Sequence, residues 1–415
     1  MEKITIDFKK THPFAQYGAT NGPWPTKRTG PGEELYRQLN FTWSRLHDTG
    51  LLGLHRYVDI DKIFPDFNLD ENNPDNYHFA DTDRFVNKLV ALNKKIIFRL
   101  GYSAVITKHY KNKVPASIDK WARIACNIAK RYSDRVEYFE IWNEPDLKIF
   151  FEGSLEQFCE IYAKTATLMK EEIEGVRIGG CGFADGTGEF ARGFLSYVKA
   201  HHLPLDFYSY HRYHHVPSEY RRLGFEVRKM LDQYGFKKCI TILDEWNFNI
   251  NFNRQLNASY RAIQTNQGAM FTLATLIEIA KTPIDINTYY DFQVSYMLFF
   301  YNGLLKLGFP LTLKKTRTYE AYSMFNIVRT VGEYYDCPAS AKGLYAIACK
   351  KENILYVLMV NYRFMDNRDM DVEVDLNGLD YQKVLVVGSE GVCEMKHVDH
   401  FELKDESYIL IKYYL

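Results

Sequence analysis

The sequence lacks the patterns that mark disulfide-bonded, metal-binding and membrane-spanning proteins. Its 415 residues include seven cysteines, an odd number, and none of them forms a CxxC pair. We therefore expect reduced thiols, no metal site, no cofactor and a cytoplasmic setting. No apolar run is long enough to cross a bilayer, so no membrane partner is predicted. The opening residues hold no apolar signal-peptide core, although a secreted form that had lost its signal would look the same.

An excess of either charge is also missing. Lys and Arg together number 52, as do Asp and Glu, so the formal net charge is zero. This balance argues against nucleic acid or another polyanion as a partner held by bulk electrostatics. The composition is otherwise ordinary for a globular enzyme, with 46% hydrophobic and 25% charged residues, and it leaves homo-oligomerisation open.

Strands and helices alternate over about three hundred residues. The expected strands are 14–19, 41–47, 95–101, 136–144, 177–183, 205–213, 239–245 and 284–291, and the long helices between them are 81–93, 117–132, 154–174, 188–201, 218–235 and 256–280. This alternation predicts an α/β fold, a closed (β/α)₈ barrel of the TIM type. An open doubly wound sheet would need a glycine-rich phosphate loop after an early strand, and the segment 101–104 is not one.

The pattern changes near residue 336. The segments that follow are short and β-rich, namely 343–350, 353–361, 370–376, 382–388, 391–397 and 406–414, with turns such as Asn377-Gly378 between them. They predict a small antiparallel β-sandwich, whose edge is completed by the alternating strand at 3–8. The expected division is a joining strand within 1–13, a catalytic barrel over 14–335 and an accessory β domain over 336–415.

Two glutamates stand at the ends of two expected barrel strands. Pro145 cannot donate to a sheet ladder, so Glu144 is expected to be the last residue of the fourth strand. On the seventh strand, a mostly β-branched run leads into Asp244 and Glu245. Because functional residues of such barrels lie at the C-terminal strand ends, the two glutamates are expected to meet there. A retaining glycosidase needs two such carboxyl groups, a protonated acid/base (Glu144) and an ionised nucleophile (Glu245).

Other polar and aromatic residues cluster at the same strand ends: Arg45, His47, Asp48, Asn143, His211, Tyr213, Trp246 and Tyr289. His211 and Tyr213 alternate on one strand, so both can face the barrel mouth. Tyr213 is then expected to donate to Glu245, and His211 to orient Glu144 or a sugar hydroxyl; a purely structural, hydrogen-bonded pair is the alternative. The adjacent histidines 214 and 215 point to opposite faces and no HExxH accompanies them, so no metal site is predicted.

Two further groups have expected roles at the mouth. Arg45 or Arg99 is expected to neutralise Glu140, which lies deeper in the barrel, and Arg45 could instead reach the nucleophile. His47 and Asp48 are candidates for binding sugar hydroxyls. The aromatic residues Trp246, Tyr289 and Tyr290 are candidate platforms for the apolar face of a sugar ring.

Together these residues resemble the retaining barrel glycosidases of clan A, and most of all glycoside hydrolase family 39, the family of β-xylosidases and α-L-iduronidases. The segments that carry the resemblance are Arg45-Leu46-His47-Asp48, Phe139 to Asp146 and His211-Arg212-Tyr213, with Glu245 on the seventh strand. The resemblance implies that Glu144 is the acid/base, Glu245 the nucleophile and Asn143 the ligand of the substrate 2-hydroxyl. Two departures are Asp48, where family xylosidases usually carry a glycine, and tyrosines on the eighth strand, where many clan members place a tryptophan.

The leading hypothesis is therefore a retaining glycosidase that removes terminal sugars from oligosaccharides, with β-xylosides first. The same mechanism on an α-L-arabinoside, α-L-iduronide or β-galactoside is the alternative; a uronic acid would need a cation, for which Arg99 and Lys108 are candidates. An inverting mechanism is a further variant. It would require the carboxyl groups of the two glutamates to lie further apart than in a retaining enzyme. A hypothesis of another class is a non-catalytic carbohydrate-binding protein that uses the barrel mouth as its cleft.

Overall fold

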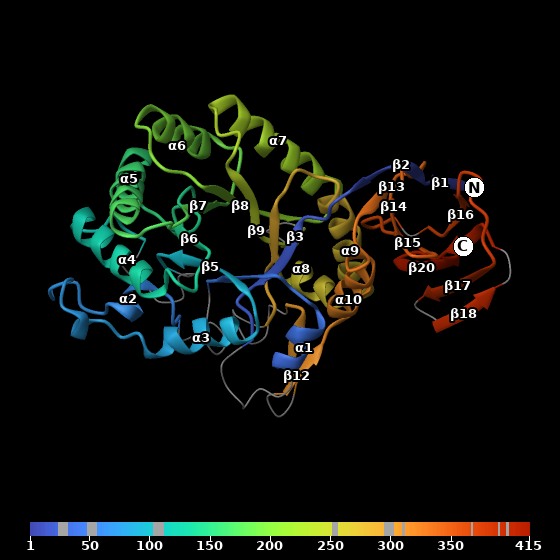
Figure 1. Ribbon diagram of the computed structural model, residues 1–415, viewed down its shortest axis with the longest axis horizontal. Helices are drawn as coiled ribbons and strands as arrows, with labels where there is room; N and C mark the ends of the chain where they lie inside the picture. The colour runs from blue at the N-terminus through green and yellow to red at the C-terminus, as the bar shows by residue number, and fades with distance from the viewer. Residues whose placement is uncertain are drawn as a thin grey trace.

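The structure is a computed structural model that describes residues 1–23, 32–47, 56–102, 112–250, 256–293, 303–308, 312–366, 368–388, 391–395 and 398–415. Two lobes lie side by side (Figure 1): a barrel ringed by helices, and a smaller lobe of strands that contains the first and the last residues of the chain. Within these ranges, no helix combines the length and the apolar character that a membrane crossing requires.

The larger lobe is a closed parallel barrel, as the sequence predicts. Its strands neighbour one another in the order β10-β3-β4-β5-β6-β7-β8-β9. Their bounds are β3 (Gln16–Thr20), β4 (Trp43–Leu46), β5 (Lys95–Leu100), β6 (Tyr138–Ile141), β7 (Ile178–Phe183), β8 (Phe207–His214), β9 (Ile240–Phe248) and β10 (Ile286–Tyr289). Each of the eight expected strands overlaps one strand of the barrel. They could be predicted because strands buried on both faces are runs of apolar residues.

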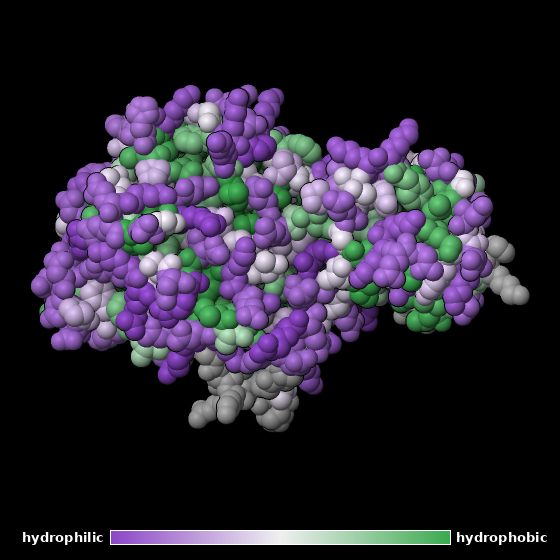
Figure 2. Space-filling model, viewed as in Figure 1, coloured by the Kyte–Doolittle hydropathy of each residue, from purple (hydrophilic) through white to green (hydrophobic). Residues whose placement is uncertain are grey.

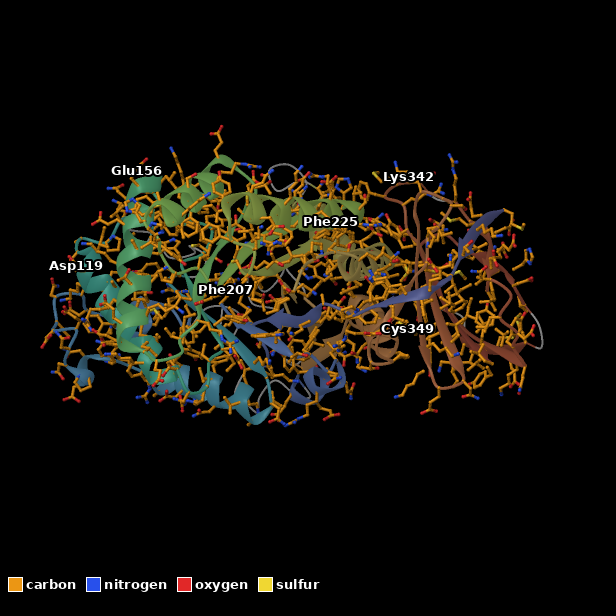
Figure 3. All side chains as sticks on the ribbon, turned by 45° about the horizontal axis from the view of Figure 1, so that its top comes forward. Asp119, Glu156, Phe207, Phe225, Lys342 and Cys349 are labelled. Atoms are coloured by element: carbon orange, nitrogen blue, oxygen red, sulfur yellow. The ribbon has the colours of Figure 1, made fainter. Side chains whose placement is uncertain are left out.

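The outer layer consists of α1 (Gly32–Gln38), α2 (Ile60–Ile63), α3 (Ala80–Ala91), α4 (Ile118–Tyr132), α5 (Leu155–Glu172), α6 (Glu189–Ala200), α7 (Ser218–Tyr234), α8 (Leu256–Ile263), α9 (Asn266–Ala280) and α10 (Arg317–Arg329). The expected helix 256–280 is two helices, because Thr265 adopts an extended conformation between them. A capping box at Ser154 and Gln157 begins α5, whose Glu156 lies at the outer edge of the molecule (Figure 3).

An apolar layer closes the lower part of the barrel. It is formed by inward side chains of six strands: Trp43, Ile97, Tyr138, Phe207, Ile242 and Ile286. Phe207 is labelled among the barrel strands in Figure 3. Two residues further along their strands, the inward positions of β4, β6, β8 and β9 carry polar groups instead: Arg45, Glu140, Ser209 and Asp244, all fully buried. The change from apolar to polar therefore occurs within the barrel, towards its C-terminal mouth.

The smaller lobe contains two sheets that enclose a core of their own. The seven-stranded sheet has the order β18-β17-β20-β15-β14-β13-β2 and the three-stranded sheet the order β1-β16-β19. Their strands are β1 (Glu2–Thr5), β2 (Asp7–His12), β13 (Tyr334–Asp336), β14 (Leu344–Lys351), β15 (Ile354–Asn361), β16 (Met370–Asp375), β17 (Lys383–Gly388), β18 (Gly391–Met395), β19 (His400–Leu403) and β20 (Ser407–Tyr414). A hairpin of β11 (Leu305–Gly308) and β12 (Thr312–Lys315) precedes α10.

The predicted fold class is confirmed, with one refinement at the start of the chain. The single strand expected at 3–8 is two strands, β1 and β2, which join different sheets on either side of the buried Ile6. β1 pairs with β16 in parallel, whereas β2 pairs with β13 antiparallel. The face of the molecule shown in Figure 2 is mostly hydrophilic on both lobes, with hydrophobic residues in separate small areas.

Candidate active site

Glu144 lies beyond the end of its strand, which corrects the expectation that it is the last strand residue. β6 ends at Ile141, and Trp142 and Glu144 have φ values of 73° and 47°. Such backbone conformations cost a non-glycine residue about 1–3 kcal/mol each and cluster at functional sites. The backbone N–H of Glu144 donates to the carbonyl of Gly182 at 3.0 Å, which ties the turn to β7.

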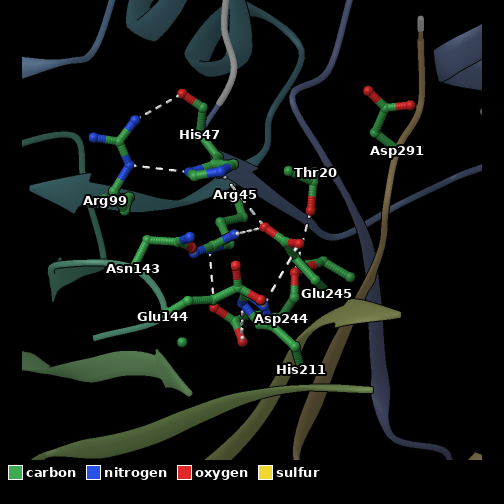
Figure 4. Close-up of polar contacts among 12 residues, drawn as sticks. Thr20, Arg45, His47, Arg99, Asn143, Glu144, His211, Asp244, Glu245 and Asp291 are labelled. Atoms are coloured by element: carbon green, nitrogen blue, oxygen red, sulfur yellow. Dashed lines mark hydrogen bonds and ion pairs between the residues drawn. The ribbon is translucent and has the colours of Figure 1, made fainter. Parts of the chain in front are cut away.

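The same turn separates Trp142 from Glu144. Alternation along a continuous strand would place both on the same face as Glu140, but the ring of Trp142 packs in the helical layer, 5.5 Å from Trp121 and 5.4 Å from Phe151. The carboxyl group of Glu144 instead points towards the barrel axis (Figure 4). Packing of the indole thus stabilises the strained turn that presents the carboxyl group.

A bulge in β9 brings two successive acidic residues into the barrel. Tyr210 of β8 pairs with Leu243, but the next residue, His211, pairs with Glu245, so Asp244 is an extra residue in the ladder. Strict alternation would turn Asp244 away from the side that Glu245 faces. Because of the bulge, both carboxyl groups contact the inward-facing guanidinium of Arg45.

Trp246 and Tyr289 are not brought to this cluster, which corrects their expected role as sugar platforms. The bulge leaves Trp246 facing outwards, where its ring lies 5.9 Å from that of Tyr220 on α7. Tyr289 packs against Trp246 and against Tyr322 of α10. The side chains of Tyr289 and Trp246 are fully buried. Tyr290 lies nearer the mouth, with its ring 6.3 Å from that of Tyr213.

Arg45 is the centre of the polar cluster (Figure 4). Its Nη1 lies 2.6 Å from Oε1 of Glu245, and its Nη2 donates to Oδ1 of Asn143 at 2.7 Å. Its Nε lies 2.7 Å from Oε2 of Glu140 and 2.9 Å from Oδ2 of Asp244. The side chain is fully buried, and the three carboxyl groups outweigh the effect of burial and hold the pKa of Arg45 well above its ordinary value. Arg45 therefore holds residues from two other strands, β9 and β6 with the turn that follows it, around one charge.

His211 and Tyr213 contact both glutamates from β8. Nδ1 of His211 lies 2.9 Å from Oε1 of Glu144 and 3.6 Å from Oε2 of Glu245. The hydroxyl of Tyr213 donates to the same Oε2 of Glu245 at 2.7 Å. These contacts are the ones that the alternation of His211 and Tyr213 predicts.

Burial and charge act differently on the members of the cluster. Burial raises the pKa of Glu144, and the effect exceeds the opposing influence of His211. Burial would lower the pKa of His211, but the carboxylates of Glu245, Asp244 and Glu144 hold it well above its ordinary value. Burial raises the pKa of Glu140 to about 8, whereas Arg45 and His211 overcome burial at Asp244 and lower its pKa to about 2. Of these two carboxyl groups on Arg45, Glu140 therefore favours its protonated form and Asp244 its ionised form.

His47 and Arg99 form a second pair beside the cluster. Nε of Arg99 donates to Nδ1 of His47 at 3.0 Å, and the same guanidinium pairs with the buried carboxylate of Asp59. Since Nδ1 accepts this bond, the proton of a neutral His47 lies on Nε2, which is 3.7 Å from Oε1 of Glu245. Burial, Arg45 and Arg99 lower the pKa of His47, which keeps the ring neutral. The structure therefore presents His47 as a hydrogen-bond donor next to Glu245.

Glycine at position 182 permits the close packing of this cluster. Gly182 has a φ of 57°, and a Cβ atom there would lie 3.0 Å from Nε2 of His211, 3.2 Å from Nη2 of Arg45 and 3.4 Å from Oδ1 of Asn143. Gly182 was not recognised from the sequence, and neither was Asp244. A directly adjacent Asp-Glu pair on a buried strand was the available signal for Asp244. Asp48, a predicted ligand of the sugar, lies outside the described residues.

No site for a metal ion is found in the part of the chain that the structure describes, where no three His, Cys, Asp or Glu side chains are grouped as ligands. The charged groups of the cluster neutralise one another instead. Arg45 and His211 are its cations, and Asp244 and Glu245 face them. The arrangement can transfer a proton at Glu144 and offer a carboxylate oxygen at Glu245.

Comparison with known sequences gives a consistent picture. The sequence pattern described as glycosyl hydrolases family 39 matches residues 10–307, which include every residue of the cluster. A β-xylosidase of Geobacillus stearothermophilus is 26% identical over 194 residues, which are 42% of this chain and 36% of that protein. A β-xylosidase of Caldicellulosiruptor saccharolyticus is 28% identical over 246 residues, 52% of this chain and 49% of that protein. The chain thus matches half or less of the length of these relatives.

Solved structures share the fold over the whole chain. A glucosidase from Croceicoccus marinus superposes with a TM-score of 0.76 at 19% identity, covering 100% of this chain and 99% of that one. A GH51 α-L-arabinofuranosidase from Thermotoga petrophila superposes with a TM-score of 0.70 at 14% identity, covering 99% of this chain and 100% of that one. At these identities the likeness shows a common architecture of barrel and β lobe.

Proposed function

This chain belongs to glycosyl hydrolases family 39, as the motifs at 45–48, 139–146 and 211–213 indicate, and we propose that it removes terminal sugars from oligosaccharides by a retaining mechanism. The observation that carries the proposal is the pair formed by Glu144 and Glu245 around a single nitrogen of His211. Membership in the family implies a carbohydrate substrate. The sugar, the mechanism and the roles of the residues are proposed here.

The spacing of the two carboxyl groups supports retention over inversion. Nδ1 of His211 lies 2.9 Å from an oxygen of Glu144 and 3.6 Å from an oxygen of Glu245. These oxygens can be no further apart than the sum of the two distances. That sum only reaches the lower end of the separation of about 6.5–9.5 Å between inverting carboxyl groups, whereas retaining pairs lie at about 5–5.5 Å. A separation below that range leaves less room for the water that inversion needs between the base and the sugar.

In the first step, Glu144 donates its proton to the glycosidic oxygen while Glu245 attacks the anomeric carbon. The bond from that carbon to the leaving oxygen breaks, and an ester bond to Glu245 forms. Burial raises the pKa of Glu144, which favours the protonated form that a general acid requires. Arg45 and Tyr213 each donate to a different oxygen of Glu245, which orients the carboxylate for attack.

In the second step, Glu144 acts as the base. Formation of the ester removes the negative charge of Glu245, which had opposed the ionisation of Glu144. Glu144 then accepts a proton from water as the water attacks the anomeric carbon and the ester bond breaks. Asn143, held by Arg45, is proposed to bind the substrate 2-hydroxyl, and His47 to donate to a second hydroxyl.

We propose a neutral sugar, β-xylose first, because the two relatives described above are β-xylosidases. Arg99, one of two cations considered for a uronic acid, is fully buried and paired with Asp59. Its charge is therefore already matched by a buried carboxylate. The other, Lys108, lies outside the described residues. An α-L-arabinoside or β-galactoside uses the same mechanism and remains the alternative to test.

Release of the aglycone from a panel of aryl glycosides tests the proposal. The panel comprises the β-D-xyloside, α-L-arabinoside, α-L-iduronide, β-D-galactoside and β-D-glucoside. We expect the β-D-xyloside to be cleaved fastest and the product to keep its anomeric configuration, as NMR of the first-formed sugar would show. An inverted product would contradict the mechanism. Calorimetric binding of an oligosaccharide that is never cleaved would favour the carbohydrate-binding alternative.

Glu144→Ala should lose the general acid but keep the nucleophile. With a substrate whose leaving group needs no protonation, we expect azide to restore turnover and to yield a glycosyl azide, because azide needs no base. In the wild type, activity towards a poor leaving group should fall as the pH rises through the raised pKa of Glu144, and this basic limb should be absent from the variant. Rates measured from pH 4 to 9 with and without azide check both results. A variant with an unchanged basic limb would exclude Glu144 as the acid.

A further inference from the structure

Asp244 is a buried anion that the proposed mechanism does not use. Its side chain is fully buried, and its Oδ1 lies 3.6 Å from Nε2 of His211 while its Oδ2 lies 2.9 Å from Nε of Arg45. Nε2 of His211 is itself buried and forms no hydrogen bond with a described group, and neither does Oδ1 of Asp244, so the two face each other as an ion pair. Among the residues that the structure describes, Asp244 is thus the acceptor that faces Nε2 of His211. The two glutamates face Nδ1, on the other side of the ring.

His211 therefore lies in a line of charges that runs from Glu144 through the imidazole to Asp244. Its Nδ1 faces Glu144 and Glu245, and its Nε2 faces Asp244. An imidazolium ring has a proton on both nitrogens, so it needs an acceptor at each. A neutral ring with its proton on Nε2 could accept from protonated Glu144, but it would have no proton for Glu245, and once Glu144 ionises its Nδ1 lone pair would face a carboxylate, at a cost of about 1–3 kcal/mol.

We propose that Asp244 is a positioning residue that keeps His211 cationic throughout the reaction, so that the Nδ1 proton of His211 serves Glu245 before the ester forms and Glu144 afterwards. The inference deepens the proposed function and rests on it. Before the first step the negative charge is on Glu245, and after it the charge is on Glu144. His211 contacts an oxygen of each, so the cation does not need to move when the charge does.

The groups around His211 agree with a fixed cation. From the end of β6 it is faced by Glu144, and Asp146 adds a more distant carboxyl; from β9 it is faced by Asp244 and Glu245. The cation near His211 is Arg45. His47, whose pKa is lowered, is a further titratable neighbour and is neutral. β7 contributes only the glycine at 182, which leaves room for the ring. The carboxyl groups outnumber Arg45, and they hold the pKa of His211 high.

Asp244→Asn should affect the second step more than the first. Without the anion, Nε2 loses its charged acceptor and His211 becomes neutral. In either tautomer of the neutral ring the positive charge that favours ionised Glu144 is lost, so Glu144 ionises less readily when it must act as base. The substrate for this test is the dinitrophenyl glycoside of the sugar that the panel identifies. With it we expect kcat to fall by at least about tenfold and KM to fall in parallel. A pre-steady-state burst of aglycone should appear, because the ester accumulates. Azide should restore kcat, and the basic limb of kcat/KM for a poor leaving group should move up by about one pH unit.

The matched control is Glu140→Gln, which changes an equally buried carboxyl group on Arg45 but does not face His211. Effects that act through Arg45 should appear in both variants, whereas the burst and the shift of the pH limb should appear in Asp244→Asn alone. The contrary result is that Asp244→Asn loses kcat and kcat/KM in equal measure and shows no burst, no rescue by azide and no shift of the pH limb. That result would give Asp244 a structural role only and would overturn the proposal. Asp244→Glu should recover part of the wild-type behaviour.

A measurement on the wild type keeps the inference testable if Asp244→Asn does not fold. In protein labelled with ¹⁵N-histidine, His211, assigned through a His211→Gln variant, should show protons on both ring nitrogens at pH 7. A neutral His211 there would overturn the proposal. If the wild type cleaves no glycoside of any kind, the proposed function fails, whereas the NMR result still decides whether Asp244 holds His211 cationic.

Discussion

Glu245→Ala should abolish turnover of every glycoside that the wild type cleaves, with a loss in kcat on the order of 10⁴-fold or more. The reason is that no other described carboxylate is oriented as Glu245 is, by Arg45 at one oxygen and Tyr213 at the other. Asp244 lies next in sequence, but it is fully buried against Nε of Arg45, so we do not expect it to replace the proposed nucleophile. Steady-state rates with a dinitrophenyl glycoside would measure the loss.

Two observations would sharpen this result. Glu226→Ala alters an exposed glutamate on α7 that pairs only with Arg222 among the described contacts, and it should keep the wild-type rate. The loss in Glu245→Ala should persist with the most activated leaving group, because a better leaving group does not replace the attacking oxygen. A variant within tenfold of the wild type would show that Glu245 is not the nucleophile.

Arg45→Met should lower the free energy of unfolding by about 3–5 kcal/mol, a large loss for a single substitution. Arg45 is fully buried and pairs with Glu140, Asp244 and Glu245, which would remain in the barrel without their common cation. Methionine has a similar volume and avoids a cavity, so the loss reports the charge. Urea unfolding of both proteins, followed by tryptophan fluorescence, measures the difference.

The loss in Arg45→Met should depend on pH. Without the cation, the buried carboxyl groups favour their protonated forms, so the folded variant binds more protons than the unfolded chain and its stability falls as the pH rises. The deficit relative to the wild type should therefore be smaller at pH 5 than at pH 8. Arg84→Met is the control, because Arg84 is exposed and pairs with Asp81 at the surface, where an ion pair is worth about 0–1 kcal/mol. An equal deficit at both pH values would point to lost packing instead.

The sequence was sufficient for the barrel because its strands are short apolar runs that end in polar residues, and each of the eight could be placed. The helix at 317–329 and the hairpin before it were not foreseen. The break between α8 and α9 was also missed, since Gln264 and Thr265 are no stronger as breakers than residues elsewhere in these helices. Local composition therefore predicted the elements better than their interruptions.

The candidate site was predicted in its residues more than in its geometry. His211, Tyr213 and Arg45 contact the glutamates as the strand periodicity indicates. Trp246 was misplaced because its direction depends on the bulge at Asp244, and a bulge is defined by the register of a neighbouring strand rather than by local sequence. The strand containing Glu144 was extended too far for a related reason, since positive φ at Trp142 and Glu144 is imposed by tertiary contacts.

The strands β1 and β2 have a consequence for the order in which the protein is made. They pair with β16 and β13, whose residues lie more than three hundred positions later in the chain. At a synthesis rate of about 5–20 residues per second, the first twelve residues wait roughly 20–70 s on the ribosome for partners while the barrel emerges. Through that interval they present unpaired strand edges, and charged side chains at Lys3, Asp7, Lys9 and Lys10 are the kind that discourage pairing with another nascent chain.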